Sequence, residues 1–275
     1  MSDSIKKHLP TAAVVLLALL LGGWKYWDYL NNPWTRNGMV RANVIQVTPR
    51  VSGPIVELPI VDNQAVKAGD PLFRIDPRTF QENVDSTTAE EIRTRSDFER
   101  AEDLIKTGDI SKRDYDAATA AFDVAKANKE SARLDLEFTE VRASVDGFIT
   151  NLDLRIGSQA VANQPVMALV DRNSFWVDGY FRETMIGDME PGDKALVTLM
   201  TYPDTTLTGT VDSIGWGIAQ ADGSTSYELL PAIEPTFEWI RLAQRVPVRI
   251  QLDEVPEHVK LRVGTTASVL VKAHD

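Results

Sequence analysis

The segment from residue 51 to 76 recurs, with substitutions, as residues 145 to 170. The copies open as Val51-Ser-Gly-Pro-Ile-Val-Glu-Leu-Pro-Ile60 and as Val145-Asp-Gly-Phe-Ile-Thr-Asn-Leu-Asp-Leu154. In each copy apolar residues alternate with polar ones between Asn, Gly and Pro turn formers, a pattern that predicts short strands. Neither copy is long enough to bury a core alone. We therefore expect the two halves to pack as one small flattened β-sandwich, although about 70 residues separate them.

Glycine recurs at matching places in this repeat. Gly53 in the first copy corresponds to Gly147 in the second, and Gly69 precedes the last strand of the first copy. Glycine adopts the backbone conformations that tight turns require. We predict that these three residues are turn glycines of the sandwich.

The segment between the copies changes to a helical pattern with alternating steps of four and three residues. This spacing predicts the seam of a coiled coil between two helices. The predicted seam positions are Phe80, Val84, Thr87, Glu91, Thr94, Phe98, Ala101 and Ile105 in the first arm, and Tyr115, Ala118, Phe122, Ala125, Lys129, Ala132 and Leu136 in the second. The small alanines allow close approach of the helices. Alternatively, a charged, Ala-rich helix pair is simply a solvated spacer.

A turn separates the two helical arms. It reads Thr107-Gly-Asp-Ile-Ser111, in which Gly108 can end the first helix in the left-handed conformation. Ser111, with Asp114 three residues later, resembles a capping box for the second helix. The arms should therefore form a hairpin, roughly 40 Å long at 1.5 Å per residue.

The N-terminal thirty residues have the character of a membrane segment. Lys6 and Lys7 precede an apolar run from Leu9 to Trp24, and aromatic residues and Lys25 follow it. The run lacks the small-residue pattern of a cleavage site, so we expect a retained single-pass anchor in preference to a cleaved signal peptide. The basic residues before the run favour a cytoplasmic N-terminus, which would place the body of the chain in the periplasm.

Composition and motif searches argue against several classes of function. A net charge of -11 argues against nucleic acid as a partner, and the absence of cysteine removes thiolate catalysis and Cys-ligated metals. The histidines have no metal-ligand spacing. Adjacent carboxylates such as Glu90 and Glu91, or Glu102 and Asp103, point to different faces of a helix and cannot act as an acid/base pair. The histidines are His8, His258 and His274. We predict no catalytic, cofactor or metal site.

The C-terminal part alternates short strand patterns with turn clusters from about residue 175 to 271, which predicts a small antiparallel β-barrel. Residues 217 to 234 lack a pattern and are expected to form a long loop. Residues 34 to 44 could pair with the last strand as a membrane-proximal domain. The expected division is an anchor (1–30), a linker or membrane-proximal strand (31–44), the first sandwich half (45–77), the hairpin (78–140), the second half (141–171) and the barrel with a membrane-proximal C-terminus (172–275).

Several of these segments resemble the HlyD-type membrane fusion proteins, the periplasmic adaptors of tripartite pumps. The segment from Val61 to Asp76 is similar to the first lipoyl-like half-motif of that family, and Val141-Arg-Ala143 echoes the entry to the second. Asn32-Pro-Trp-Thr-Arg36 and the stretch from Glu238 to Ile250 are similar to the adaptors for aromatic carboxylic acids. The resemblance covers nearly the whole chain. It implies a mainly β fold with a helical hairpin, and efflux as the function.

The resemblance also implies a docking motif at the hairpin turn. Adaptors that dock on TolC-type outer-membrane channels carry Arg, Leu, Ser and a bulky residue at fixed spacing, which here are Arg100, Leu104, Ser111 and Tyr115. Relatives often have Leu where this chain has Tyr115. The alternative is that Leu104 and Tyr115 close the coiled coil and Ser111 only caps a helix. The implied partners are an inner-membrane transporter, the outer-membrane channel and further copies of the chain, in a trimer or hexamer.

Two other functions are weighed against the adaptor. A lipoyl or biotinyl carrier bears its modified Lys on a tight hairpin between the two halves, where this chain has the helical insert. Lys67 and Lys126 do not stand at that position, so no cofactor is expected. A membrane-anchored spacer without a role in export would keep the hairpin but tolerate loss of Arg100 and Leu104. The expected cargo of the adaptor is small aromatic acids or drug-like compounds.

Overall fold

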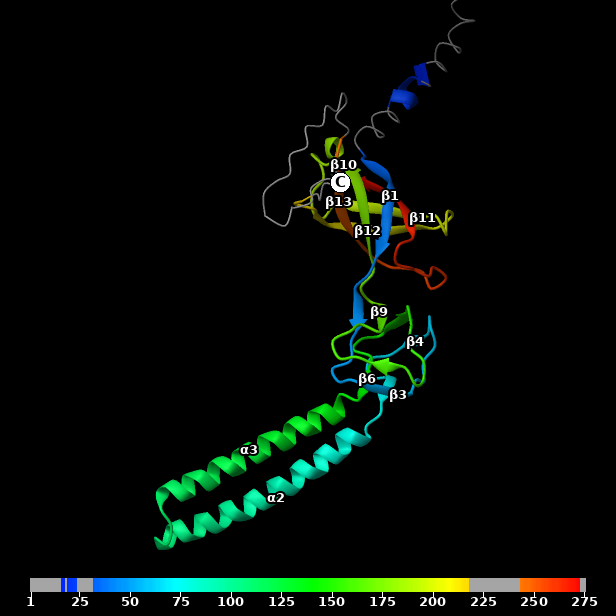
Figure 1. The fold of residues 1–275 in the computed structure, drawn as a ribbon. Coiled ribbons are helices and arrows are strands. Elements are labelled where there is room, and N and C mark those ends of the chain that lie inside the picture. Colours follow the sequence, from blue (N-terminus) through cyan, green and yellow to red (C-terminus); the bar gives the residue numbers. More distant parts are fainter. Residues whose placement is uncertain (1–15, 18, 24–31, 218–242, 273–275) are drawn as a thin grey trace, which may run out of the picture. The chain divides into compact units, whose positions relative to one another are not determined.

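The computed structural model describes residues 16–17, 19–23, 32–217 and 243–272, and Figure 1 draws its helices and strands. The chain divides into two compact units. One unit is Asn43–Asn173, and the other combines Met1–Ala42 with Ser174–Asp275. The middle of the sequence thus forms one body, and the two ends of the sequence together form the other.

The expected anchor, residues 1–30, lies mostly outside the described residues. Leu16, Leu17 and residues 19–23 are described, and they are helical and exposed. Within the part of the chain that the structure describes, no helix combines the length and the hydropathy that crossing a bilayer requires.

The sandwich is built from two four-stranded sheets, and each sheet takes strands from both copies of the repeat. One sheet has the order β2-β9-β7-β4 and the other the order β6-β5-β3-β8. The strands are β2 (Val44–Val47), β3 (Gly53–Glu57), β4 (Ala65–Val66), β5 (Pro71–Ile75), β6 (Glu140–Arg142), β7 (Gly147–Thr150), β8 (Gln159–Ala160) and β9 (Met167–Asp171). Because neither sheet is complete without the other copy, the halves fold as a single domain. The split lipoyl-like sandwich is confirmed.

The prediction that three glycines form turns is correct only for Gly69, whose φ is 89°. Gly53 and Gly147 are the first residues of strands β3 and β7, and both are buried. A Cβ at Gly147 would lie 2.2 Å from the Val170 carbonyl oxygen, and one at Gly53 would lie 2.6 Å from Ile75 Cγ2. These two glycines are therefore needed for close packing inside the sandwich, which sequence spacing cannot distinguish from a turn.

The hairpin consists of α2 (Arg78–Thr107) and α3 (Lys112–Glu137), which run side by side in Figure 1. Their 30 and 26 residues correspond to about 45 and 39 Å of helix. Every predicted seam position is at least partly shielded from solvent. The fully buried ones are Glu91, Thr94, Ala101, Ala125 and Ala132. The seam prediction thus placed the contact face correctly, and small and polar side chains fill its centre.

The barrel is closed, with the strand order β1-β10-β13-β12-β11-β14. Its strands are β1 (Trp34–Arg41), β10 (Trp176–Arg182), β11 (Lys194–Leu199), β12 (Thr206–Ile214), β13 (Arg245–Leu252) and β14 (Thr266–Lys272), with a single 3-10 turn at Glu183–Met185 after β10. Inward side chains such as Phe181, Ile250 and Val177 are completely buried and form one apolar core.

The segment 31–44, expected to be a linker or a membrane-proximal strand, contains the strand Trp34–Arg41, which closes the barrel. β1 pairs with β14 on one side, where Trp34 faces Leu270, and with β10 on the other, where Val40 faces Val177. The expected pairing of this segment with the last strand is confirmed, but its place in the closed barrel was not predicted, and Val40 is the only large apolar side chain that β1 buries completely. Most of the expected loop at 217–234 lies outside the described residues.

Candidate docking site at the hairpin tip

The turn between α2 and α3 is fixed by backbone hydrogen bonds. Gly108 has φ 80°, and its N–H donates to the Ile105 carbonyl oxygen at 3.3 Å. The next amide, Asp109 N–H, donates to the Leu104 carbonyl oxygen at 2.9 Å. This pair of bonds is a Schellman motif with glycine in the left-handed position, and it satisfies carbonyl groups that the helix end would otherwise leave free. The turn is therefore a defined structure.

Ser111 begins α3 as its N-cap. The Asp114 N–H donates to Ser111 Oγ at 3.2 Å, and Ser111 Oγ donates to the Asp114 carboxylate at 2.7 Å. The Asp114 side chain also lies in the first turn of the helix, where the helix dipole favours a negative charge. The cap predicted from sequence is confirmed. Ser111 itself is exposed, so capping leaves its surroundings open to a partner.

We use "hairpin tip" for residues 100–115, the segment that carries the predicted docking residues. Arg100 is exposed, with 68% of its side chain accessible, and pairs with Asp97 at 3.1 Å. Leu104 and Tyr115 are partly buried. The Tyr115 ring lies 5.9 Å from the Phe98 ring, centroid to centroid, so Tyr115 contributes to the seam between the helices. The tip thus presents a cation and a hydroxyl beside half-covered apolar side chains.

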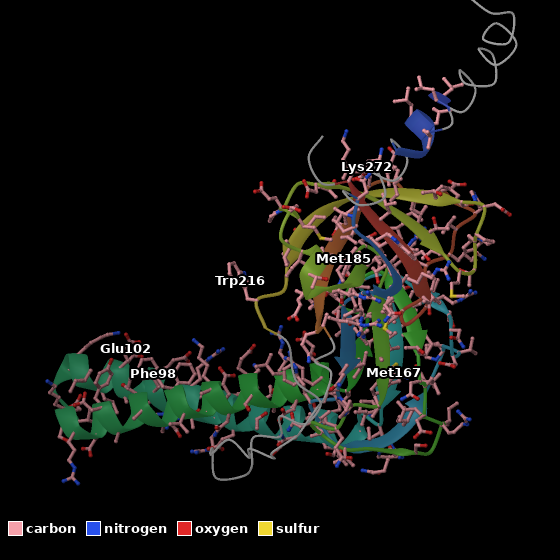
Figure 2. All side chains as sticks on the ribbon, turned by 90° about the horizontal axis from the view of Figure 1, so that it is seen from above. Phe98, Glu102, Met167, Met185, Trp216 and Lys272 are labelled. Atoms are coloured by element: carbon pink, nitrogen blue, oxygen red, sulfur yellow. The ribbon has the colours of Figure 1, made fainter. Side chains whose placement is uncertain are left out.

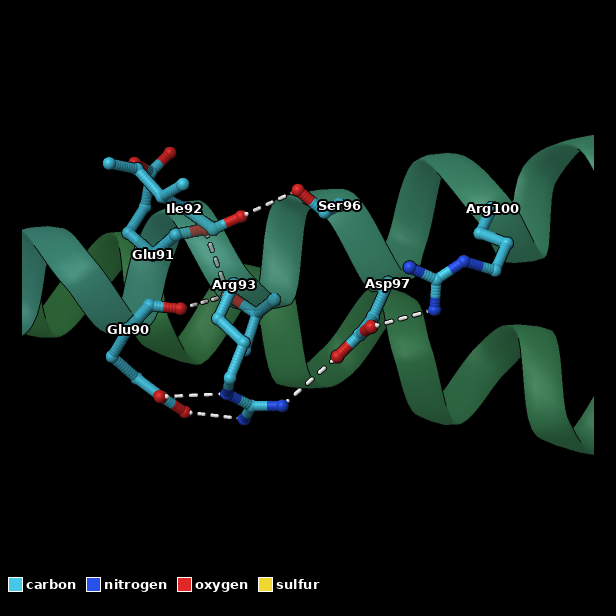
Figure 3. Close-up of polar contacts among 8 residues, drawn as sticks. Glu90, Glu91, Ile92, Arg93, Ser96, Asp97 and Arg100 are labelled. Atoms are coloured by element: carbon cyan, nitrogen blue, oxygen red, sulfur yellow. Dashed lines mark hydrogen bonds and ion pairs between the residues drawn. The ribbon is translucent and has the colours of Figure 1, made fainter.

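A ladder of ion pairs leads along α2 to Arg100, as Figure 3 shows. Glu90 pairs with Arg93 at 2.7 Å, Arg93 with Asp97 at 3.0 Å, and Asp97 with Arg100 at 3.1 Å. The hydrogen bond from Arg93 lowers the pKa of Glu90 and raises that of Arg93. Because each step spans three or four residues, the ladder holds its members on one helix face. The ion pair with Asp97 therefore holds the Arg100 side chain on the same helix face.

Inside the seam lies a carboxylate that sequence reasoning placed on the contact face without assigning it a partner. The side chain of Glu91 is only 3% exposed, and it pairs with Arg95 on its own helix. Across the seam, Lys129 Nζ of α3 lies 3.6 Å from Glu91 Oε2. The other ion pairs within the described helices join residues of one helix. A polar pair at one seam position fixes the alignment of two helices, and here that alignment sets which tip residues face one another.

The remaining candidate residues form no second site in the described part of the chain. His258 Nε2 lies 3.5 Å from the Thr205 hydroxyl, and its ring meets Tyr202 edge-on. Among the described residues, no three His, Cys, Asp or Glu side chains come together in a way that could hold a metal ion. Lys67 stands at a turn after β4, where its amide donates to the Asp70 carboxylate, and Lys126 lies on α3. His8 and His274 lie outside the described residues.

A closed antiparallel barrel joined to a sandwich that a helical hairpin interrupts is the architecture of the periplasmic adaptors. Comparison with known families agrees for both units. The RND MFP barrel-sandwich hybrid domain matches residues 43–172, and the AAEA-like beta-barrel domain matches residues 174–272. The chain belongs to the membrane fusion protein family, the adaptor subunits of efflux pumps, and its barrel is of the AAEA-like type.

Individual proteins are similar to this chain over most of its length. YdhJ of Escherichia coli K12 is 41% identical over 285 residues, which cover 98% of this chain and 99% of YdhJ. A MacA-MexA chimeric protein with the Pseudomonas aeruginosa MexA α-hairpin domain is 26% identical to this chain and superposes with a TM-score of 0.72. The match covers 89% of this chain and 83% of the chimeric chain. The membrane fusion protein Spr0693 of Streptococcus pneumoniae R6, 17% identical, shares the fold over 88% of this chain and 99% of its own with a TM-score of 0.66.

Proposed function

We propose that this adaptor is held in the inner membrane by its N-terminal segment, with the N-terminus in the cytoplasm and the body in the periplasm. There it links an inner-membrane transporter to a TolC-type outer-membrane channel. Copies of the chain associate as a trimer or hexamer around the path of the exported compound. The hairpin tip makes the contact with the channel through Arg100, Leu104, Ser111 and Tyr115.

The observation that carries this proposal is the construction of the tip. A Schellman turn and an N-cap fix the ends of both helices, so the exposed Arg100 and Ser111 are presented on a preorganised surface. Preorganisation lowers the entropy that a binding surface loses when its partner docks. The tip also carries Arg100 and Tyr115, two of the residue types in which interface hot spots are enriched. A hairpin that served only as a spacer would have the same turn and cap but would tolerate the loss of Arg100 and Leu104.

Photo-crosslinking in living cells tests the docking. A photoreactive amino acid at position 111 should capture an outer-membrane channel, identified by mass spectrometry. The same amino acid at the exposed Ser131, near the other end of α3, provides the matched control and should not capture the channel. Capture of the adaptor alone at position 111, with the protein folded and membrane-bound, would support the spacer function instead.

The compound exported is proposed from the AAEA-like character of the barrel. We propose small aromatic carboxylic acids, with drug-like amphiphiles as the second class. A strain without this gene should grow less well in the presence of hydroxybenzoates, and the wild-type gene should restore growth. Unchanged sensitivity to hydroxybenzoates, together with increased sensitivity to neutral or cationic drugs, would exclude the acids and favour the second class.

A further inference from the structure

Trp216 carries an indole ring that the barrel does not cover. Its relative exposure is 105%, so the ring is fully open to solvent. One residue, Gly215, separates it from the end of β12, and Gly215 N–H donates to the Pro247 carbonyl oxygen at 2.8 Å, which holds the chain next to Trp216 against β13. Figure 2 shows the ring pointing away from the barrel. An indole combines a large apolar surface with one N–H donor, so leaving it in water sacrifices a considerable gain from burial.

The strand directions place Trp216 at a defined end of the barrel. β1 is antiparallel to β10, β10 to β13, and β13 to β12. The start of β1 therefore lies at the same end as the finish of β12, and the finish of β14 lies there too. Trp34, with Arg36 over its ring at 5.6 Å, and Lys272 share this end with Trp216.

The covalent chain keeps this end of the barrel close to the membrane. The proposed anchor ends near residue 30, and β1 begins at Trp34. Four residues span at most about 14 Å when fully extended. The polar layer on each side of a bilayer is about 5–8 Å thick, since the whole bilayer measures roughly 40–45 Å and its hydrocarbon core about 30 Å. A side chain that projects from this end of the barrel can therefore reach the headgroup layer.

We propose that Trp216 rests in the headgroup layer of the inner membrane and gives the barrel a second membrane contact. This inference depends on the proposed N-terminal anchor. Tryptophan is enriched at that depth because its ring is amphipathic. Sites for protein partners are contiguous apolar patches, whereas no other large apolar side chain at this barrel end is strongly exposed among the described residues. The single indole therefore fits a lipid surface better than a protein partner.

The absence of cysteine from the chain allows a direct test with site-specific labels. The variants Trp216→Cys and Met200→Cys each receive one environment-sensitive fluorophore in the full-length protein. Met200 is 72% exposed and follows β11, which puts it at the opposite end of the barrel, so it is the matched control. Both proteins are placed in nanodiscs of phosphatidylcholine and phosphatidylglycerol. Circular dichroism and thermal unfolding confirm that each variant is folded.

The label at position 216 should shift its emission to the blue and resist aqueous quenchers, whereas the label at position 200 should behave as in water. If the protein stays on the nanodiscs and both labels report water, the second contact is refuted and the anchor stands. If the protein does not remain with the nanodiscs, the anchor itself fails. A label at 216 that is shielded in native membranes but not in nanodiscs of lipid alone would identify a protein partner and overturn the proposal.

Discussion

The barrel and the helical hairpin are stabilised in different ways. The barrel encloses one apolar core in which Phe181, Val248 and Ile250 are completely buried. The hairpin buries two alanines on α3, and on α2 its fully buried residues include Glu91 and Thr94. Apolar burial of the barrel's kind contributes roughly 25 cal/mol per Å², whereas a seam of small and polar residues gains much less. The barrel is built for stability, and the hairpin for alignment of its tip.

The hairpin aligns its tip with far less buried apolar surface than the barrel has. A slender two-helix element has few residues in its core, so it depends on caps, on one cross-helix ion pair and on one aromatic cluster. The aromatic cluster joins Phe98 to Tyr115 and to Phe122, the latter at 5.5 Å between ring centroids. Changes in any of these features should therefore loosen the tip without affecting the barrel.

The two units can be followed separately by spectroscopy. Residues 43–173 contain no tryptophan, so all six tryptophans of the chain lie outside the sandwich and the hairpin, and two of them, Trp34 and Trp176, are partly buried in the barrel. Tryptophan fluorescence thus reports unfolding of the barrel, and circular dichroism at 222 nm reports mainly the long helices α2 and α3.

The largest effect is expected from Phe181→Ala in the barrel core. Removing a fully buried phenylalanine costs about 3–5 kcal/mol of unfolding free energy. Phe98→Ala in the partly exposed seam should cost about 1–2 kcal/mol, because less apolar surface is lost. Urea unfolding followed by fluorescence and by circular dichroism measures the two values. Equal losses for the two variants would contradict the proposed difference between the units.

The next largest effect is expected from Lys129→Met. This change leaves Glu91 buried with Arg95 alone and should destabilise the hairpin by about 1–3 kcal/mol. Replacing both Glu91 and Lys129 with Leu should recover most of the loss, because an apolar pair avoids desolvating charge. Circular dichroism measures stability, and spin labels on the two helices measure their alignment. If Lys129→Met is neutral in both measurements, the ion pair does not set the alignment.

Loss of the N-cap should have a smaller effect. Ser111→Ala removes the acceptor for the Asp114 amide and should cost about 1 kcal/mol of hairpin stability. The matched change is Ser96→Ala, because Ser96 Oγ donates to the Ile92 carbonyl oxygen in mid-helix, where such bonds add little. Thermal unfolding followed by circular dichroism at 222 nm compares the stability of the two variants. Equal effects would mean that Ser111 is not an energetically important cap.

The smallest effect concerns pH at the start of the hairpin. Hydrogen bonds from Arg78 lower the pKa of Asp76 to about 2 from its ordinary value of 3.8. A lowered carboxyl pKa contributes stability above the unfolded value, and that contribution disappears as the pH falls from about 4 to about 2. NMR titration of the Asp76 carboxyl should give a midpoint near the lower value in the wild type. In Arg78→Met the midpoint should rise, and an unchanged midpoint would exclude Arg78 as the cause.

The sequence predicted elements with a strong period better than those defined by packing. The seam face, the Gly108 turn and the Ser111 cap follow local rules of spacing and capping, and the structure has all three. The pairing of β1 with the last strand agrees with the prediction, but its role as a barrel strand is not evident from the sequence, because a strand that buries little apolar surface resembles a loop. The prediction of turns at Gly53 and Gly147 is wrong, because only three-dimensional packing reveals that a Cβ there would collide with Ile75 or Val170.

The partner of Glu91 was also beyond sequence reasoning, although both members of the pair were assigned to the seam. Glu91 and Lys129 are separated by a turn, and their meeting depends on how α2 and α3 align along the seam. A small error in the assumed turn length would pair Glu91 with a different residue of α3. The spacing of seam residues therefore identifies which face of each helix contacts the other helix, and tertiary packing decides which residues on those faces touch.

The most direct test of the adaptor's function is binding of a TolC-type channel to the full-length protein in nanodiscs, with Arg100→Ala compared to Arg133→Ala. The two arginines are matched: their side chains are 68% and 67% exposed, and each pairs with a carboxylate three residues earlier. Arg100→Ala should weaken binding about tenfold or more, as a hot-spot residue does, and Arg133→Ala should leave it unchanged. Equal affinities for both variants and the wild type would contradict docking through the hairpin tip.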